Sequence, residues 1–182
     1  MGSALDTIVA CATPWGRSAI ALLRLSGPNA LLLCRDLCPG GPVWTPRRAT
    51  VRHAMDNDRV LDRVVITHMP APNTYTGEDI VEIGCHGNPV IVEAIIDCLV
   101  RRGARPARPG EFTRRAVEHG RMNLLQAEAV AGVIDATSTQ GVRLAQAALG
   151  GSVEKHVAAL REKGLDLAAE LEARLDHPDD DL

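Results

Sequence analysis

One stretch of the sequence organises the fold, and it reads Met69-Pro-Ala-Pro-Asn-Thr-Tyr-Thr-Gly-Glu-Asp-Ile-Val-Glu-Ile-Gly-Cys-His-Gly-Asn-Pro89. Pro70 and Pro72 oppose regular strand pairing, and the polar residues after them favour a turn. Ile80 to Ile83 then form a short β-prone run. We expect Gly84 and Gly87 to break this run.

A carboxylate, Glu82, lies in the middle of that run. Burying it alone costs several kcal/mol, so it needs a partner that donates hydrogen bonds. Two interpretations stay open: an edge strand with Glu82 facing water, or Glu82 binding a ligand with two adjacent N–H donors. Glu78 and Asp79 lie at the strand entrance, where we expect solvent to reach them. Arg24, near the end of the apolar run 18–25, either reaches solvent or meets an acid or a ligand.

Composition narrows the class of protein. A chain of 182 residues can form one domain with a full core, or a domain plus a smaller helical part. Apolar residues make up 46%, as in soluble globular proteins, but aromatic residues only 2%. The four rings belong to Trp15, Trp44, Tyr75 and Phe112, too few for base-stacking platforms. A net charge of −3 argues against general nucleic-acid binding.

Charge is unevenly distributed along the chain. Residues 101–121 hold seven arginines and two glutamates, whereas residues 152–182 hold nine acids and four bases. An arginine cluster can bind a phosphate or a polycarboxylate ligand, although a solvated helix face is the commoner explanation.

The five cysteines form no CxxC pair, and Cys34-x3-Cys38 lacks a second ligand pair, so we expect no metal site. Cys85 and His86 would point apart in a strand, and nothing nearby completes a triad. We therefore favour a structural histidine and predict no catalytic residue. Asp6 interrupts any signal-peptide core, and no apolar run reaches membrane-spanning length, so we expect a cytoplasmic protein without a membrane segment.

Hydrophobic periodicity and turn residues predict the remaining elements. We expect strands at 6–12, 18–25, 49–55, 60–69 and 104–107, and helices at 29–38, 88–103 and after Pro109. From Asn123 onward the pattern is helical. Asn123-x-x-Gln126 and Thr137-x-x-Gln140 resemble capping boxes that begin two helices, and Gly150-Gly151 ends the second.

Ser152 is predicted to cap a last helix of roughly 25 residues. It carries an apolar stripe of Val153, Val157, Leu160, Leu167, Leu171 and Leu175, and an acidic segment, 177–182, follows it. Such a stripe needs partner helices to cover it. We therefore predict an α+β chain with an α/β domain at 1–120 and an incomplete helical segment at 121–182.

Six blocks in the same order carry a resemblance to a known family. They are Thr7-Ile-Val-Ala-Cys-Ala-Thr-Pro14, Leu23-Arg-Leu-Ser-Gly-Pro28, Tyr75-Thr-Gly-Glu-Asp-Ile-Val-Glu82, His86-Gly87, Pro109-Gly-Glu-Phe-Thr-Arg-Arg115 and Leu125-Gln-Ala-Glu-Ala-Val130. Together they closely resemble the N-terminal part of the MnmE (TrmE) family of tRNA-modifying GTPases, from about Asp6 to Leu182. The resemblance implies a tetrahydrofolate-binding, aminomethyltransferase-like α/β domain, followed by the first part of an all-α helical bundle.

The resemblance also implies a function. With its flavin-containing partner MnmG, in a heterotetramer, the dimeric family adds carboxymethylaminomethyl or aminomethyl groups to C5 of the wobble uridine of tRNA. GTP, K⁺ and Mg²⁺ would need the family's GTPase domain, which is inserted within the helical one. This sequence contains no GxxxxGK[ST], NKxD or DxxG motif, so we expect it not to hydrolyse GTP.

By position, the family's folate contacts fall on Arg24, Glu82 and Arg121. A carboxylate such as Glu82 can accept both the N3–H and the 2-amino group of a pterin, as in 5-formyltetrahydrofolate or a related folate. Arg24 could meet a carbonyl, a glutamyl carboxylate or Glu82 itself. Lysine is common in relatives where this chain has Arg121, so the contact geometry changes there. Two alternatives remain: a stand-alone folate-dependent one-carbon transferase, and a non-catalytic dimerisation scaffold.

Overall fold

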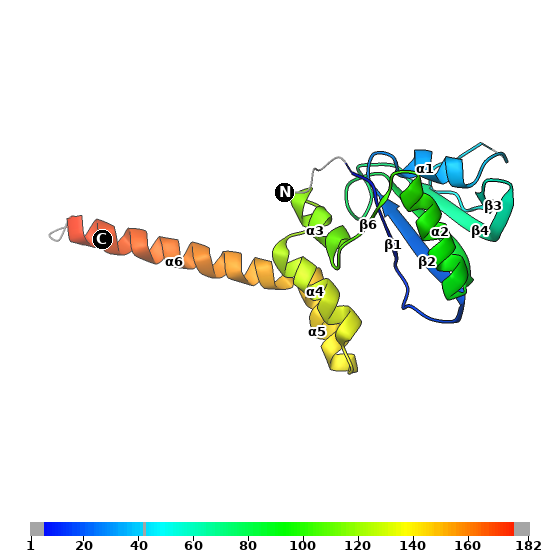
Figure 1. The fold of residues 1–182 in the computed structure, drawn as a ribbon. Helices are drawn as coiled ribbons and strands as arrows, with labels where there is room; N and C mark the ends of the chain where they lie inside the picture. Colours follow the sequence, from blue (N-terminus) through cyan, green and yellow to red (C-terminus); the bar gives the residue numbers. More distant parts are fainter. Residues whose placement is uncertain (1–5, 42, 177–182) are drawn as a thin grey trace. The chain divides into compact units, whose positions relative to one another are not determined.

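The structure is a computed structural model that describes residues 6–41 and 43–176. The chain divides into two compact units, one ending at Arg121 and one beginning at Met122. The strands are β1 (Ile8–Cys11), β2 (Ser18–Ser26), β3 (Thr50–Asp56), β4 (Arg59–Met69), β5 (Ile80–Gly87) and β6 (Arg105–Pro106). The helices of the first unit are α1 (Ala30–Leu37), α2 (Pro89–Arg101) and α3 (Glu111–Glu118) (Figure 1). The mixed architecture agrees with the predicted α/β domain followed by a helical segment.

The six strands form one sheet in the order β3-β4-β5-β2-β1-β6, and only the β1–β6 pair is parallel. β5 lies between β4 and β2, so the interpretation of Glu82 as an edge-strand residue is wrong. The strand also runs on through Gly84, because Gly84 pairs with Val65 on one side and Leu22 on the other. The predicted break at Gly84 is therefore wrong too, since pairing on both sides outweighs the low strand propensity of glycine.

Alternation along the strands separates two faces of the sheet. One face packs against α1 and α2 and forms the core, with Leu23, Leu25, Val64, Ile66, Val81 and Ile83 from the strands and Leu33, Leu37, Val92, Ile95 and Leu99 from the helices. The opposite face, called the outer face below, carries the alternate residues, including Arg24 on β2 and Glu82 on β5. This face positions the candidate site.

Two asparagines begin helices as predicted. The Asn88 side chain accepts the Val90 N–H at 3.0 Å, with proline in the first turn of α2. Asn123 and Gln126 form the predicted capping box at the start of α4 (Leu124–Asp135). Each cap accepts a hydrogen bond from a backbone N–H group that has no partner within the helix.

The start of α5 (Thr139–Leu149) differs from the prediction. Ser138, and not Thr137, is the N-cap, and its hydroxyl accepts the Gly141 N–H at 3.1 Å. Serine and threonine are both N-cap residues, and the Thr137-x-x-Gln140 spacing pointed to the wrong one of two adjacent candidates. The helix ends before Gly150, as expected.

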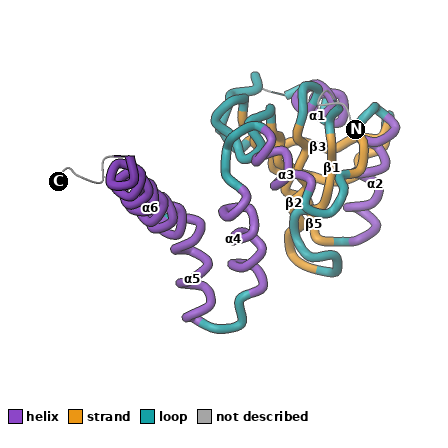
Figure 2. Tube along the Cα trace, turned by 90° about the vertical axis from the view of Figure 1, so that its left-hand side faces the viewer, coloured by secondary structure: helices purple, strands orange, loops and turns teal. Residues whose placement is uncertain are grey.

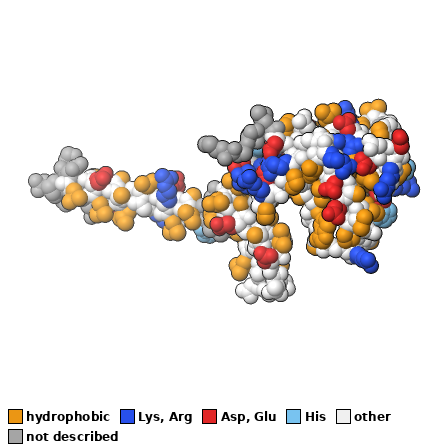
Figure 3. Space-filling view, viewed as in Figure 1, with side chains coloured by type: hydrophobic (Ala, Val, Ile, Leu, Met, Phe, Trp, Pro, Cys, Tyr) orange, Lys and Arg blue, Asp and Glu red, His pale blue; other side chains and the backbone are white. Residues whose placement is uncertain are grey.

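α6 (Ser152–Asp176) is a single helix of 25 residues that follows the α4–α5 hairpin (Figure 2). Its exposed large apolar side chains are Val157, Leu160, Leu165, Leu167, Leu171 and Leu175. Figure 3 shows hydrophobic side chains along this helix. The predicted contributions of the Ser152 and Val153 side chains and of segment 177–182 lie outside the described residues. Among the described residues, the apolar stripe of α6 is left uncovered.

We expect backbone amides of residues 157–173 to exchange with deuterium at least about tenfold faster than those of β5. An isolated helix gains little stability without tertiary packing, whereas β5 is paired on both sides. Hydrogen exchange followed by mass spectrometry on the purified chain measures both segments in one sample. Equal protection of the two segments in a monomeric sample would contradict the expectation.

Candidate functional site

Arg24 and Glu82 are direct neighbours across the β2–β5 pair and lie on the outer face. Glu82 Oε1 accepts hydrogen bonds from Arg24 Nη2 at 2.6 Å and from Arg24 Nε at 3.0 Å. The side chains are 26% and 25% exposed. Within the described part of the chain, neither Glu82 Oε2 nor Arg24 Nη1 has a hydrogen-bond partner. The pair therefore presents one acceptor and one donor to an incoming ligand.

Two aromatic rings from distant segments lie beside this pair. The guanidinium carbon of Arg24 is 5.6 Å from the centroid of Tyr75 and 5.9 Å from that of Phe112. These distances allow cation–π attraction, which holds the guanidinium group in place. The Tyr75 hydroxyl and the Thr113 hydroxyl are hydrogen-bonded at 2.8 Å, so the 70–79 loop and α3 are joined at the site.

Arg121 approaches the same loop from the end of the first unit. Its Nε donates to the Thr74 carbonyl at 3.1 Å. Its side chain also lies against Gly77, where a Cβ atom would be 3.4 Å from Arg121 Cγ and Cδ. Gly77 has φ of +81°, which a side chain would strain. The structure thus brings Arg24 and Glu82 into contact and attaches Arg121 to the loop that carries Tyr75.

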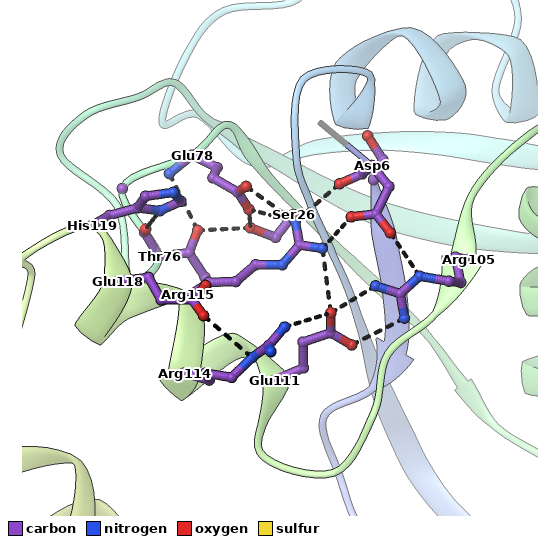
Figure 4. Close-up of polar contacts among 12 residues, drawn as sticks. Asp6, Ser26, Thr76, Glu78, Arg105, Glu111, Arg114, Arg115, Glu118 and His119 are labelled. Carbon is purple, nitrogen blue, oxygen red and sulfur yellow. Dashed lines mark hydrogen bonds and ion pairs between the residues drawn. The ribbon is translucent and has the colours of Figure 1, made fainter. Parts of the chain in front are cut away.

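A buried ion network supports this loop, and Arg115 of α3 is its centre (Figure 4). Arg115 Nη1 donates to the two carboxylate oxygens of Glu78 at 3.0 and 3.1 Å and to the Asp6 carbonyl at 2.9 Å. Arg115 Nη2 donates to Asp6 Oδ1 at 2.5 Å and to Glu111 Oε1 at 3.4 Å. One guanidinium group therefore links the N-terminal segment, the 70–79 loop and α3.

Arg105 adds a second cation to the network. Its Nη2 and Nη1 donate to Glu111 Oε1 and Oε2 at 2.6 and 3.1 Å, and its Nε donates to Asp6 at 2.7 Å. The Arg108 backbone N–H also donates to Glu111 at 2.7 Å. Hydrogen bonds from Arg105, outweighing the opposing effect of burial, lower the pKa of Glu111 to about 2 and also lower that of Asp6.

The network corrects two expectations. Glu78 does not face solvent, because its side chain is mostly buried against Arg115 and accepts the Ser26 hydroxyl at 2.7 Å. The arginine-rich segment 101–121 is also not simply a solvated helix face. Arg105 and Arg115 form ion pairs with acids of the chain itself. The local charge count did not reveal these pairs, because Asp6 and Glu78 lie far away in the sequence.

A second acid lies unexpectedly within a strand. Asp62 of β4 is 8% exposed at its side chain, yet it accepts the backbone N–H groups of Arg63 and His86, both at 2.8 Å. Its Oδ1 also lies 2.7 Å from Nδ1 of His86, whose side chain is 68% exposed. Burial acts to raise the pKa of Asp62, but these hydrogen bonds outweigh it and the pKa is lowered. Cys85 points into the core, away from His86, as predicted.

Tyr75, Phe112 and Asp62 were not predicted as neighbours of functional candidates. A signal for Asp62 was present, because it is an acid inside an apolar strand, as Glu82 is. Tyr75 and Phe112 stood out in the sequence only because they are the single tyrosine and the single phenylalanine of the chain.

The described residues contain no group of three or more His, Cys, Asp or Glu side chains placed to hold a metal ion. No helix among them is both long enough and apolar enough to span a bilayer.

We expect Glu111→Gln to destabilise the first unit by about 3 kcal/mol at pH 7, because it removes one buried carboxylate that two arginines share, Arg105 and Arg115. The folded-state pKa of Glu111 is depressed, so its contribution is present above its unfolded value near 4.5 and is lost as the pH falls towards about 2. Urea unfolding of the two proteins between pH 7 and pH 3 should show the difference shrinking with pH. Glu118→Gln, on the exposed side of the same helix, should change stability by less than about 0.5 kcal/mol. Equal losses of stability in Glu111→Gln and Glu118→Gln would contradict a stabilising role for the buried ion network.

Comparison with known proteins gives the family. Residues 7–121 match the family described as the GTP-binding protein TrmE N-terminus, and residues 124–182 match the MnmE helical domain. The chain is 42% identical over 178 residues to the tRNA modification GTPase MnmE of Pseudothermotoga lettingae, covering 97% of this chain and 40% of that protein. It is 44% identical over 184 residues to the MnmE of Nitratidesulfovibrio vulgaris strain DP4, with the same two coverages.

These relatives are longer proteins, and the chain spans about 40% of their length. The two matched families adjoin along the sequence and together cover nearly the whole chain. The chain therefore belongs to the MnmE (TrmE) family of tRNA modification GTPases.

Proposed function

We propose that this chain binds a tetrahydrofolate one-carbon donor and forms the dimerising part of a tRNA-modifying GTPase in the cytoplasm. With MnmG, such an enzyme adds carboxymethylaminomethyl or aminomethyl groups to C5 of the wobble uridine. In this proposal GTP hydrolysis, with its K⁺ and Mg²⁺, is the task of the family's GTPase domain, whose nucleotide-binding motifs lie outside these 182 residues. The names of the relatives, which are tRNA modification GTPases, support the proposal at the level of the family.

The Arg24–Glu82 pair is the observation that carries the folate proposal. A pterin has a flat edge with adjacent N–H donors and a carbonyl acceptor. In this proposal Glu82 Oε2 accepts from this edge and Arg24 Nη1 donates to the carbonyl, since neither atom has a hydrogen-bond partner among the described residues. Because Oε1 already accepts two bonds from Arg24, we assign the pterin donors to Oε2.

The neighbouring groups suit a flat ring. Tyr75 and Phe112 lie beside Arg24 and offer apolar faces, and Arg121 adds a cation at the edge of the loop. We propose Arg24, Glu82 and Arg121 as the folate-binding residues. The ring of the folate would replace water over the ion pair and thereby strengthen its hydrogen bonds.

We expect Glu82→Gln to weaken the binding of 5-formyltetrahydrofolate by about thirtyfold to thousandfold, or about 2–4 kcal/mol. The substitution removes a charged acceptor and can place an amide donor against the N–H donors of the pterin. Calorimetric titration of the wild-type and variant proteins measures the change. Glu93→Gln, on the exposed side of α2 behind the sheet, is the matched control and should leave the affinity unchanged. Wild-type affinity in Glu82→Gln would overturn the assignment.

We also expect the chain to sediment as a dimer, at twice 19.4 kDa, at micromolar concentration. β3 is an edge strand with an unpaired row of backbone groups, and Val51 and Val60 are exposed on it and on its partner β4. Such edges are normally covered, and a second copy is the simplest cover. Analytical ultracentrifugation decides between the two masses. A single species at the monomer mass would count against dimerisation through this unit.

A further inference from the structure

A buried histidine lies on the core side of the sheet, on the face opposite the candidate site. His68 of β4 is two residues beyond Ile66 and shares its face, and its side chain is 8% exposed. The ring nitrogen Nε2 is buried and has no hydrogen-bond partner within the described part of the chain. Buried polar groups are nearly always hydrogen-bonded, so this nitrogen is unusual.

An acid lies beside this nitrogen. Asp79 Oδ2 is 3.6 Å from His68 Nε2, which is too long for a hydrogen bond but within the range of an ion pair. The other oxygen of Asp79, Oδ1, accepts the Ala71 N–H at 2.8 Å. Asp79 therefore joins the beginning and the end of the 70–79 loop, and His68 lies next to the carboxylate that joins them.

A second contact holds the same loop near His68, and it does not change with pH. The backbone N–H of Arg47 donates to the His68 carbonyl at 2.7 Å, and Arg47 Nη2 donates to the Asn73 carbonyl at 2.5 Å. Arginine stays charged throughout the physiological pH range. Of these two contacts to the loop, only the one between His68 and Asp79 contains a group that titrates near neutral pH.

The neighbouring strands bring no second acid to His68. Its register partner on β5 is Val81, an apolar residue. Farther along the core side of β4, Asp62 is bonded to His86. Within the described residues, Asp79 is the carboxylate that forms an ion-pair contact with His68.

The other elements on this side of the sheet add no free charge to the contact. α1 contributes apolar side chains and thiols to the core, and its charged residues, Arg35 and Asp36, are exposed. Arg52 of β3 donates to the Gly40 carbonyl and lies over the Trp44 ring. The state of the His68 ring therefore depends on its burial, which opposes a charge, and on the Asp79 carboxylate, which favours one.

We propose that His68 and Asp79 form a pH-dependent contact that fastens the 70–79 loop to β4. Proton uptake makes the ring an imidazolium, so that Nε2 becomes a charged donor opposite Asp79 Oδ2. The closed loop then binds the proton more tightly than the open loop. The contact is therefore strong below about pH 6.5 and weakens as the pH rises and the proton is lost. This inference concerns the loop alone and does not depend on folate binding.

The test is hydrogen exchange of the purified chain between pH 5.5 and pH 8, followed by mass spectrometry. Rates are expressed as protection factors, which removes the intrinsic pH dependence of amide exchange. We expect the protection of residues 71–78 to fall about threefold to fivefold from pH 5.5 to pH 8, as for the loss of a partly exposed ion pair. The protection of β5 in the same sample should stay constant.

Two variants remove the contact from opposite sides. His68→Gln keeps a polar side chain that cannot take up a proton, and Asp79→Asn keeps an oxygen for the Ala71 N–H but loses the charge. Each should abolish the pH dependence of the loop's protection. His53→Gln is the matched control, because it removes an exposed histidine from β3 of the same sheet. It should leave the pH dependence as in the wild type.

Three results would overturn the proposal. The first is loop protection in the wild type that does not change with pH. The second is a pH dependence that persists in both variants, which would point to His119, whose Nδ1 lies 2.6 Å from the Thr76 carbonyl of the same loop. The third is an equal change in the loop and in β5, which would reflect the stability of the whole unit. If His68→Gln does not fold, Asp79→Asn alone decides.

Discussion

The position of the 70–79 loop in the first unit depends on the ion pairs of the buried Arg115 guanidinium group. It holds Glu78 of the 70–79 loop, Asp6 before β1 and Glu111 of its own helix. Removing a charge from water costs several kcal/mol, so such a group is stable only when its partners and hydrogen bonds are complete. Because these partners come from three segments, the ion pairs hold the irregular 70–79 loop in a single conformation over the sheet.

The network around Arg115 and the Arg24–Glu82 pair differ in how completely their groups are hydrogen-bonded. In the network around Arg115, each carboxylate accepts several hydrogen bonds and each guanidinium meets more than one acid. In the Arg24–Glu82 pair, by contrast, both bonds fall on one oxygen, and the pair is partly exposed. A stable core would favour full pairing. The pair instead leaves one donor and one acceptor without a partner among the described residues, and these are the groups that the proposed ligand uses.

Local patterns predicted most elements, because caps, turns and alternation depend on residues close in sequence. The asparagine caps of α2 and α4 are examples. Local patterns could not predict the surroundings of Glu82. Its partner Arg24 lies 58 positions away, and its strand is central only because β2 pairs with it. Glu78 was misjudged for the same reason, since its partner Arg115 is 37 positions away. Glu82 and Arg24 were singled out by the sequence as charged residues in apolar runs, whereas Arg121, and the assignment of all three to folate, came only from the family resemblance.

The outer face of the sheet exposes apolar side chains that solubility does not explain. Antiparallel sheets can expose one face to water, and that face is then usually polar throughout. Here Ile20, Val51 and Val65 are exposed, while the polar and charged side chains lie in rows on either side of Gly84. Solubility alone would favour charges spread over the face. An apolar strip between polar rows is instead typical of a surface that is covered when a molecule binds to it, because burial removes the apolar area from water.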